Sequence, residues 1–126
     1  MPDLHRFTQW LRTAHPETVT EPEMLPELAG GDPEFASSLL DAALQTFDRF
    51  ERDLRGNDRE SYLAVHSLKS TLTSLGMSGV ANRFYHTEKK LKAKEPVTEA
   101  DWQDLAEVFR SARQVTEDMK HQLHPL

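Results

Sequence analysis

Apolar residues recur every three or four positions along most of this sequence, and this periodicity limits the fold more than any other feature. An α-helix completes one turn in about 3.6 residues, so this spacing gathers apolar side chains on one helical face. No segment of adequate length alternates apolar and polar residues as a half-buried β-strand would. The sequence therefore predicts an all-α protein.

The first 20 residues are expected to form a region of their own. Leu4, Phe7 and Leu11 share one face of a short helix, and Pro16 and Pro22 mark the linker that follows. We interpret residues 1–20 as an N-terminal helix and linker, and residues 21–126 as the main domain. The length of the main domain suits a single hydrophobic core.

The main domain contains a strong signal for a helix start. Asp32 can accept hydrogen bonds from the free N–H groups of a first turn, and Pro33 suits the first helical position. The apolar stripe predicted for this helix consists of Phe35, Leu39, Ala43, Phe47, Phe50 and Leu54.

Three more helices are predicted downstream. The first ends at Gly76, the second begins at Ser78 or Gly79, and Thr98 with Asp101 forms a capping box for the third. The stripe of the first consists of Tyr62, Val65, Leu68, Leu72 and Leu75. Helices of similar length with short connections pack most simply as an antiparallel up-down four-helix bundle, with the short N-terminal helix added to it.

The composition excludes several kinds of site. The chain has no Cys, so disulfides, thiolate zinc sites and a cysteine nucleophile are excluded, and we expect no metal site elsewhere. The net charge of -6 argues against nucleic-acid binding. No apolar run approaches the roughly 20 residues of a membrane span, and the N-terminus does not resemble a signal peptide. We therefore expect a cytoplasmic protein that binds neither nucleic acid nor membrane.

The negative total charge hides one basic segment. Residues 66–94 contain six cations and one anion, a net charge of +5, whereas the remaining residues carry -11. A histidine, His66, begins this segment. An acidic partner would be attracted to this part of the surface.

His66 falls outside the predicted apolar stripe, because it directly follows Val65 within the helix. Its helical neighbours at three, four and seven residues are Lys69, Ser70 and Thr73, which are polar or small. A lone histidine on such a face would be incidental. An exposed imidazole is nevertheless a good nucleophile near neutral pH, and a lysine one turn away can neutralise a phosphoryl group. These companions favour a histidine that accepts a phosphoryl group.

Two runs carry this pattern: Val65-His66-Ser67-Leu68-Lys69-Ser70-Thr71 and Leu75-Gly76-Met77. They resemble the signature of histidine-containing phosphotransfer (HPt) domains, His-x-Leu-Lys-Gly-Ser with a Gly ten residues after the His. The similarity spans residues 21–123. It implies a four-helix bundle, which the periodicity predicts independently.

The resemblance also implies roles for single residues. His66 would be the phosphorylated residue, with Nε2 as the attacking atom, and Lys69 would pair with the phosphoryl oxygens. Glu88, from the neighbouring helix, would hydrogen-bond the imidazole and orient it. The residues of the partner-docking face would be Ser70, Thr73, Tyr85 and Lys92. Ser70 replaces the usual Gly of the motif and adds a side chain where a partner must come close.

The function implied by the resemblance is a relay of phosphoryl groups between the aspartates of response-regulator receiver domains. Mg²⁺ would be bound by the receiver, and the chain itself would need no cofactor. A hybrid sensor histidine kinase is a further partner that the resemblance allows. The sequence has no nucleotide-binding pattern, so we expect a monomeric phosphoryl carrier without ATP-dependent kinase activity of its own.

Three alternatives stay open. The same helices could form an interaction module in which His66 is chemically idle, and the presence of Ser70 favours this alternative. The chain could instead be the phosphoacceptor domain of a chemotaxis-type kinase. The dimerising histidine helix pair of a sensor kinase fits less well, because Ser67 stands where that class has an acidic residue.

Overall fold

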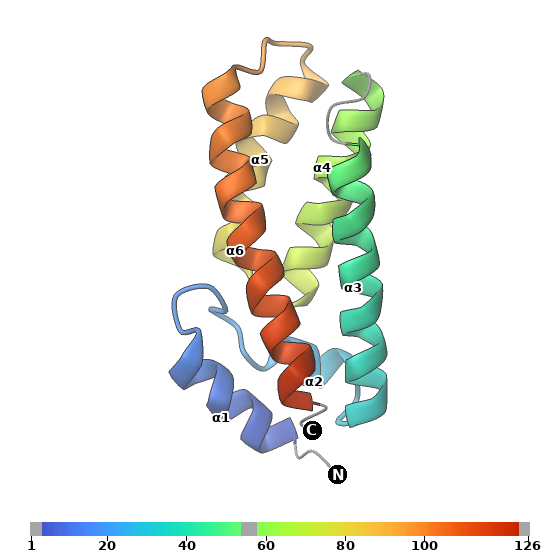
Figure 1. The fold of residues 1–126 in the computed structure, drawn as a ribbon, viewed down its shortest axis with the longest axis vertical. Helices are drawn as coiled ribbons and strands as arrows, with labels where there is room; N and C mark the ends of the chain where they lie inside the picture. Colours follow the sequence, from blue (N-terminus) through green and yellow to red (C-terminus); the bar gives the residue numbers. More distant parts are fainter. Residues whose placement is uncertain (1–3, 54–57, 124–126) are drawn as a thin grey trace.

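The structure, a computed structural model, describes residues 4–53 and 58–123, which form six α-helices and contain no β-strand (Figure 1). The prediction of an all-α protein is confirmed for this part of the chain. The helices are α1 (Leu4–Ala14), α2 (Met24–Leu28), α3 (Pro33–Asp53), α4 (Asp58–Ser74), α5 (Ser78–Lys92) and α6 (Glu99–Leu123).

The four long helices, α3 to α6, lie side by side along the long axis of the molecule (Figure 1). α4 packs against α3 and α5, and α6 packs against the same two helices. The two short helices lie at one end, where α1 contacts α6 and α2 contacts α3 and α4. Helix α4, which carries the histidine motif, therefore lies between α3 and α5.

Aromatic side chains connect three of the long helices through the core. The Phe50 ring lies 4.8 Å from the Phe109 ring and 5.9 Å from the Phe84 ring, measured between centroids. Phe47 contacts Phe109 edge-on at 5.6 Å. Such edge-on and tilted pairs add about 0.5–1.5 kcal/mol each beyond the burial of apolar area. The N-terminal helix shares this core through Leu4, Phe7 and Leu11.

The apolar stripe predicted for α3 is wrong in its first turns. Phe35 is 49 % exposed and Leu39 is only partly buried, whereas Ala36 and Leu40 are fully buried. Steps of four residues overshoot a helical turn of about 3.6 residues, so a stripe built from them drifts around the helix. The core-facing residues of α3 alternate steps of four and three instead, and they are Ala36, Leu40, Ala43, Phe47 and Phe50. Leu54, the last member of the predicted stripe, is outside the described residues.

The predicted helix starts are confirmed. The Glu34 N–H donates to Asp32 Oδ1 at 3.0 Å at the start of α3. Ahead of α6, the Asp101 N–H donates to Thr98 Oγ1 and the Thr98 N–H donates to Asp101 Oδ2, which completes the capping box. Lys90 also donates to Asp101 Oδ2, and these hydrogen bonds, that of Lys90 above all, lower the pKa of Asp101 to about 2.

The turn between α4 and α5 is tied to the segment that precedes α2. Gly76 has a φ of +83°, and a Cβ at this position would collide with the backbone carbonyl oxygen of Glu21. The Glu21 N–H donates to the Gly76 carbonyl at 3.1 Å. The Ser78 side chain and N–H hydrogen-bond the Glu21 carboxylate and lower its pKa. Only glycine tolerates both the positive φ and the close approach of Glu21 at position 76, which lies two residues after the last residue of α4.

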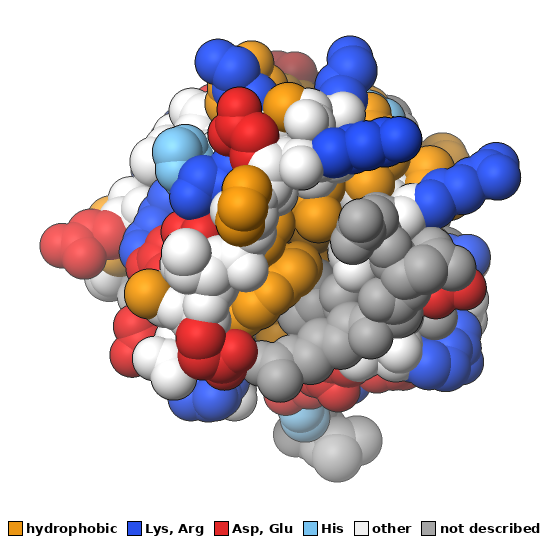
Figure 2. All heavy atoms as spheres, turned by 90° about the horizontal axis from the view of Figure 1, so that it is seen from above, with side chains coloured by type: hydrophobic (Ala, Val, Ile, Leu, Met, Phe, Trp, Pro, Cys, Tyr) orange, Lys and Arg blue, Asp and Glu red, His pale blue; other side chains and the backbone are white. Residues whose placement is uncertain are grey.

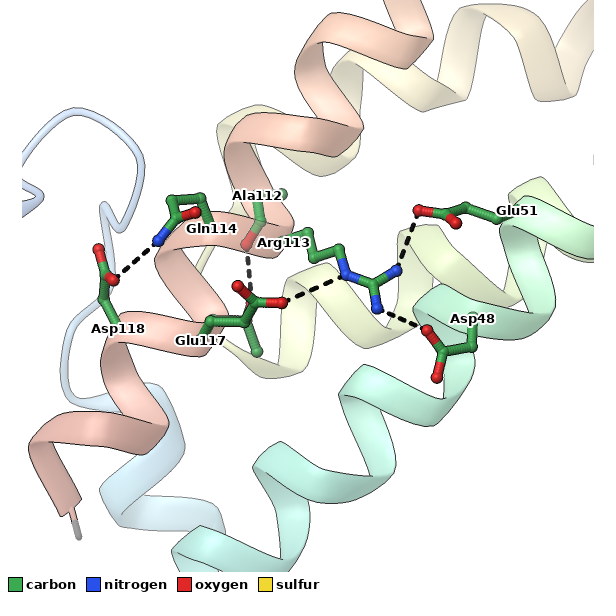
Figure 3. Close-up of polar contacts among 8 residues, drawn as sticks. Asp48, Glu51, Ala112, Arg113, Gln114, Glu117 and Asp118 are labelled. Atoms are coloured by element: carbon green, nitrogen blue, oxygen red, sulfur yellow. Dashed lines mark hydrogen bonds and ion pairs between the residues drawn. The ribbon is translucent and has the colours of Figure 1, made fainter.

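On the opposite side of the molecule, Arg113 joins α6 to α3 (Figure 3). Its guanidinium donates to Asp48 at 2.6 Å, to Glu51 at 3.0 Å and to Glu117 at 3.4 Å. The hydrogen bond to Asp48 is the main cause of the raised pKa of Arg113. This cluster holds α3 and α6 together, away from the helix that carries the histidine motif.

Candidate functional site

His66 lies about halfway along α4, and 55 % of its side chain is exposed. The residue before it, Val65, and Leu68 two positions later are fully buried. The imidazole is therefore outside the core, as the apolar stripe of α4 predicts.

A buried carboxylate from α5 meets the histidine. Glu88 Oε2 lies 3.2 Å from His66 Nδ1, and the second oxygen, Oε1, accepts a hydrogen bond from Lys69 Nζ at 3.1 Å. Only 10 % of the Glu88 side chain is exposed. The structure thus brings together His66, Lys69 and Glu88, and we call these three residues the His66 cluster.

The hydrogen bond to Glu88 determines which imidazole nitrogen can act as a nucleophile. Carboxylate oxygens only accept hydrogen bonds, so His66 Nδ1 must carry the proton in this pair. In a neutral imidazole the other nitrogen, Nε2, then holds the free electron pair. The network therefore assigns His66 a tautomer that has its nucleophilic nitrogen on the edge of the ring away from Glu88.

Two tyrosines flank the His66 cluster. The Tyr62 ring stacks on the His66 imidazole, with centroids 5.9 Å apart and planes inclined by 20°. Lys69 Nζ lies 5.0 Å from the centroid of the Tyr85 ring, a cation–π distance. Tyr85 was predicted to belong to the partner-docking face, whereas Tyr62 was predicted to lie in the core as part of the apolar stripe of α4. The contact of Tyr62 with His66 could have been expected from the sequence, because Tyr62 lies four residues before His66 and the two side chains are therefore on neighbouring turns of one helix.

The other predicted docking residues lie outside these contacts. Ser70 and Thr73 are exposed on α4, and the Thr73 hydroxyl donates to the Lys69 carbonyl at 3.0 Å. Lys92 is exposed in the last turn of α5 and forms no hydrogen bond or ion pair with the His66 cluster in the described residues. Ser70 and Thr73 therefore extend the helix face of His66, and Lys92 lies one turn after Glu88 on α5.

The basic segment does not present all of its charge to solvent. Lys69 pairs with Glu88, Lys90 pairs with Asp101, and Arg83 pairs with an acidic residue of α6. Three exposed lysines have no ion-pair partner in the described part of the chain, and they lie at or just after the C-terminal end of α5: Lys89, Lys92 and Lys94. Figure 2 views this end of the molecule, where Lys and Arg side chains project around the edge. We call Lys89, Lys92 and Lys94 the lysine cluster.

An apolar groove lies on the other side of α4, between α3 and α4. Its lining includes Leu28 and Phe35, which are 50 % and 49 % exposed. Thr71 and Ser74 of α4 form its polar edge. The sequence did not indicate this α3/α4 groove, because Phe35 fitted the predicted stripe of α3.

The described residues contain no group of three or more His, Asp or Glu side chains placed to hold a metal ion. None of the helices in this part of the chain is both long and apolar enough to cross a membrane. No protein-family model matches the chain, and no curated protein or solved structure is significantly similar to it.

Proposed function

We propose that this protein is a histidine phosphotransfer domain, in which His66 receives a phosphoryl group from the aspartate of one receiver domain and passes it to the aspartate of another. In this proposal the four long helices form the antiparallel up-down four-helix bundle of that class. The bundle carries a positioned nucleophile and a docking surface, and the receivers carry the Mg²⁺ and the rest of the catalytic groups.

The observation that carries the proposal is the pairing of an exposed imidazole with a buried carboxylate. Glu88 is held in place by burial and by Lys69, so it is a fixed acceptor for His66 Nδ1–H. A histidine that was merely solvated would not need such an anchor. The same arrangement directs the free electron pair of Nε2 away from Glu88, toward a partner.

The transfer step follows from this tautomer. Nε2 attacks the phosphorus of the receiver's aspartyl phosphate, the N–P bond forms, and the P–O bond to the aspartate breaks. The aspartate leaves as a carboxylate, and the proton on Nδ1 stays where it is. The phosphorylated imidazole then carries a positive charge next to the Glu88 carboxylate, which stabilises it. The reverse step delivers the phosphoryl group to the next receiver.

Lys69 contributes a positive charge to the same site. Its side chain is 26 % exposed, and its ammonium group lies 3.1 Å from Glu88 and 5.0 Å from the centroid of the Tyr85 ring. Because Lys69 is one turn after His66, a modest rotation of its flexible side chain would bring Nζ toward a phosphoryl group on Nε2. The lysine would then share its hydrogen bonds between Glu88 and the phosphoryl oxygens.

One observation is consistent with the second candidate, an interaction module with an idle histidine, as well as with the first. The α3/α4 groove exposes Leu28 and Phe35, and exposed apolar side chains of this size often belong to protein interfaces. The groove would serve equally well in a phosphotransfer domain that must dock onto receivers. The two candidates therefore differ only in whether His66 reacts.

Replacing His66 by Gln tests this difference. The wild-type protein should acquire acid-labile phosphate from a phosphorylated receiver, and His66→Gln should acquire none. The melting temperature should hardly change, because an exposed side chain usually contributes less than about 0.5 kcal/mol to the free energy of unfolding. A His86→Gln variant serves as the matched control, because it changes an exposed histidine on a different helix, α5. This variant should be labelled like the wild type. Equal labelling of His66→Gln and the wild type would rule out the proposed function.

A further inference from the structure

Tyr62 contacts His66 but has no role in the transfer step proposed above. Its ring stacks on the His66 imidazole at 5.9 Å, and the two residues lie on successive turns of α4. Tyr62 is only partly buried, so one part of its ring packs on the core while the other is available to His66. The stacked pair forms one wall of the His66 cluster.

A single hydrogen bond cannot hold an imidazole in one orientation. The bond from Nδ1–H to Glu88 restrains one atom of the ring, but at 3.2 Å it still tolerates coupled rotation about χ1 and χ2, which tilts the ring plane. More than half of the His66 side chain is exposed, and water does not restrict this rotation. A second contact across the ring face is needed to fix the plane.

We propose that Tyr62 is a positioning residue, which fixes the plane of the His66 imidazole while Glu88 fixes its Nδ1 edge. This inference rests on the proposed function. Together the two contacts determine the direction in which the Nε2 electron pair points. In-line attack on phosphorus depends on that direction, and small errors in it slow a transfer step strongly.

The ring of Tyr62, rather than its hydroxyl, makes this contact. Tyr62→Phe keeps the aromatic face and should preserve the orientation of His66. Tyr62→Leu keeps much of the apolar volume that packs on the core but removes the flat face. Phe35→Leu is the matched control for measurements without a receiver, because it makes the same kind of change at another partly exposed aromatic residue on a different helix.

The first measurement needs no receiver. A long-range ¹H–¹⁵N spectrum of the imidazole reports which nitrogen of His66 carries the proton. We expect the Nδ1–H form to dominate in the wild type, in Tyr62→Phe and in Phe35→Leu. In Tyr62→Leu the freed ring should leave Glu88 part of the time and populate the Nε2–H form. Identical His66 signals in Tyr62→Leu and the wild type would overturn the inference.

The second measurement separates positioning from docking. Phosphoryl transfer is followed at increasing concentrations of phosphorylated receiver. Tyr62→Leu should lower the rate at saturation by about tenfold, with a half-saturating concentration within about twofold of the wild type. Tyr62→Phe should retain the wild-type rate. An equal loss in Tyr62→Phe would overturn the inference, because the hydroxyl would then be responsible. If receivers do not label the wild type at all, the proposed function fails, and the imidazole spectra alone decide the role of Tyr62.

Discussion

At the scale of single residues, His66 must satisfy two opposing demands. A partner can reach the imidazole only if it is exposed, but transfer requires that the ring keep one orientation. The structure meets both demands, because the imidazole is exposed while its Nδ1 is held by Glu88, whose side chain is 90 % buried. Surface histidines without such an anchor would sample several orientations and both tautomers.

Lys69 should support transfer through its charge. We expect Lys69→Ala to slow phosphoryl transfer at saturating receiver by about tenfold, because one charge that stabilises the transferred group is lost. The melting temperature should fall modestly, because the buried Glu88 carboxylate loses one of its two partners but keeps its contact with His66. Lys89→Ala, which removes an unpaired lysine of α5, provides the control. If both variants transfer at the wild-type rate, Lys69 has no role in the chemistry.

Variants of Ser70 can show whether its side chain only crowds the docking face or whether its hydroxyl takes part in phosphoryl transfer. Its side chain is exposed and has no hydrogen-bond partner in the described residues, so the hydroxyl is available to a partner. Ser70→Gly should keep or raise the transfer rate, while the free energy of unfolding falls by roughly 0.5 kcal/mol because glycine is a poorer helix former than serine. Ser70→Ala should transfer at a similar rate without that loss of stability. A large decrease in rate for both variants would show that the hydroxyl takes part in transfer.

The sequence predicted the members of the His66 cluster unevenly. The exposure of His66 follows from the stripe of α4, and Glu88 was expected next to it only because of the resemblance to the HPt motif. The burial of Glu88 could not be predicted, because it depends on the rotation of α5 against α4. The contact of Tyr62 with His66 lies within α4 and is consistent with their four-residue spacing, but the apolar stripe had assigned Tyr62 to the core. Periodicity assigns a residue to a helix face but does not determine how two faces meet.

At the scale of helices and turns, capping chemistry was the most informative part of the sequence. Asp32 and the Thr98–Asp101 pair act locally, so their effect is visible without knowledge of the fold. The core-facing side of α3 was harder to predict. Phe35 and Ala36 are adjacent, and only the packing of α2 and α4 against α3 decides which of them is buried.

Gly76 should be the glycine most sensitive to substitution in the turn between α4 and α5. Gly76→Ala is expected to lower the free energy of unfolding by more than about 2 kcal/mol, since alanine disfavours the positive φ and its Cβ collides with Glu21. Gly79→Ala is the matched control, because a Cβ there meets no neighbouring atom and alanine favours a helix by about 0.5 kcal/mol or more. Urea denaturation of both variants measures the difference. Similar stabilities would contradict this account of the turn.

At the scale of the whole molecule, charge is distributed unevenly around the candidate site. Lys69 and Lys90 are paired within the protein, so the positive charge free to attract an acidic receiver is concentrated in the lysine cluster at the end of α5. The sequence predicted a basic region but could not show this internal pairing. The lysine cluster and the α3/α4 groove are thus two different surfaces by which a receiver could be recognised.

Association with receivers should depend on salt if the lysine cluster attracts them. Exposed charges are screened beyond about 10 Å at 0.1 M salt, so the association rate should fall as the salt concentration rises. Lys92→Glu should lower the rate at low salt and flatten its salt dependence. Arg6→Glu, on α1, makes the same change in net charge and should have little effect, since α1 and the end of α5 lie at opposite ends of the molecule (Figure 1).

Equal effects of Lys92→Glu and Arg6→Glu would show that only the net charge of the protein matters. Recognition would then depend on apolar contacts, and Phe35→Ala in the α3/α4 groove should weaken receiver binding instead. Lys120 is a less suitable control than Arg6, because it pairs with Asp41 and its reversal would place two acidic residues side by side.

The most direct test of the central claim is to locate the phosphorus atom on the imidazole. After incubation with a phosphorylated receiver, a ¹H–³¹P correlation spectrum identifies the ring protons close to phosphorus. Phosphate on Nε2 couples to both Hδ2 and Hε1, whereas phosphate on Nδ1 couples to Hε1 alone. We expect both correlations, from His66, because Glu88 holds the proton on Nδ1. A correlation to Hε1 alone, signals from another histidine, or no phosphorylated histidine would contradict it.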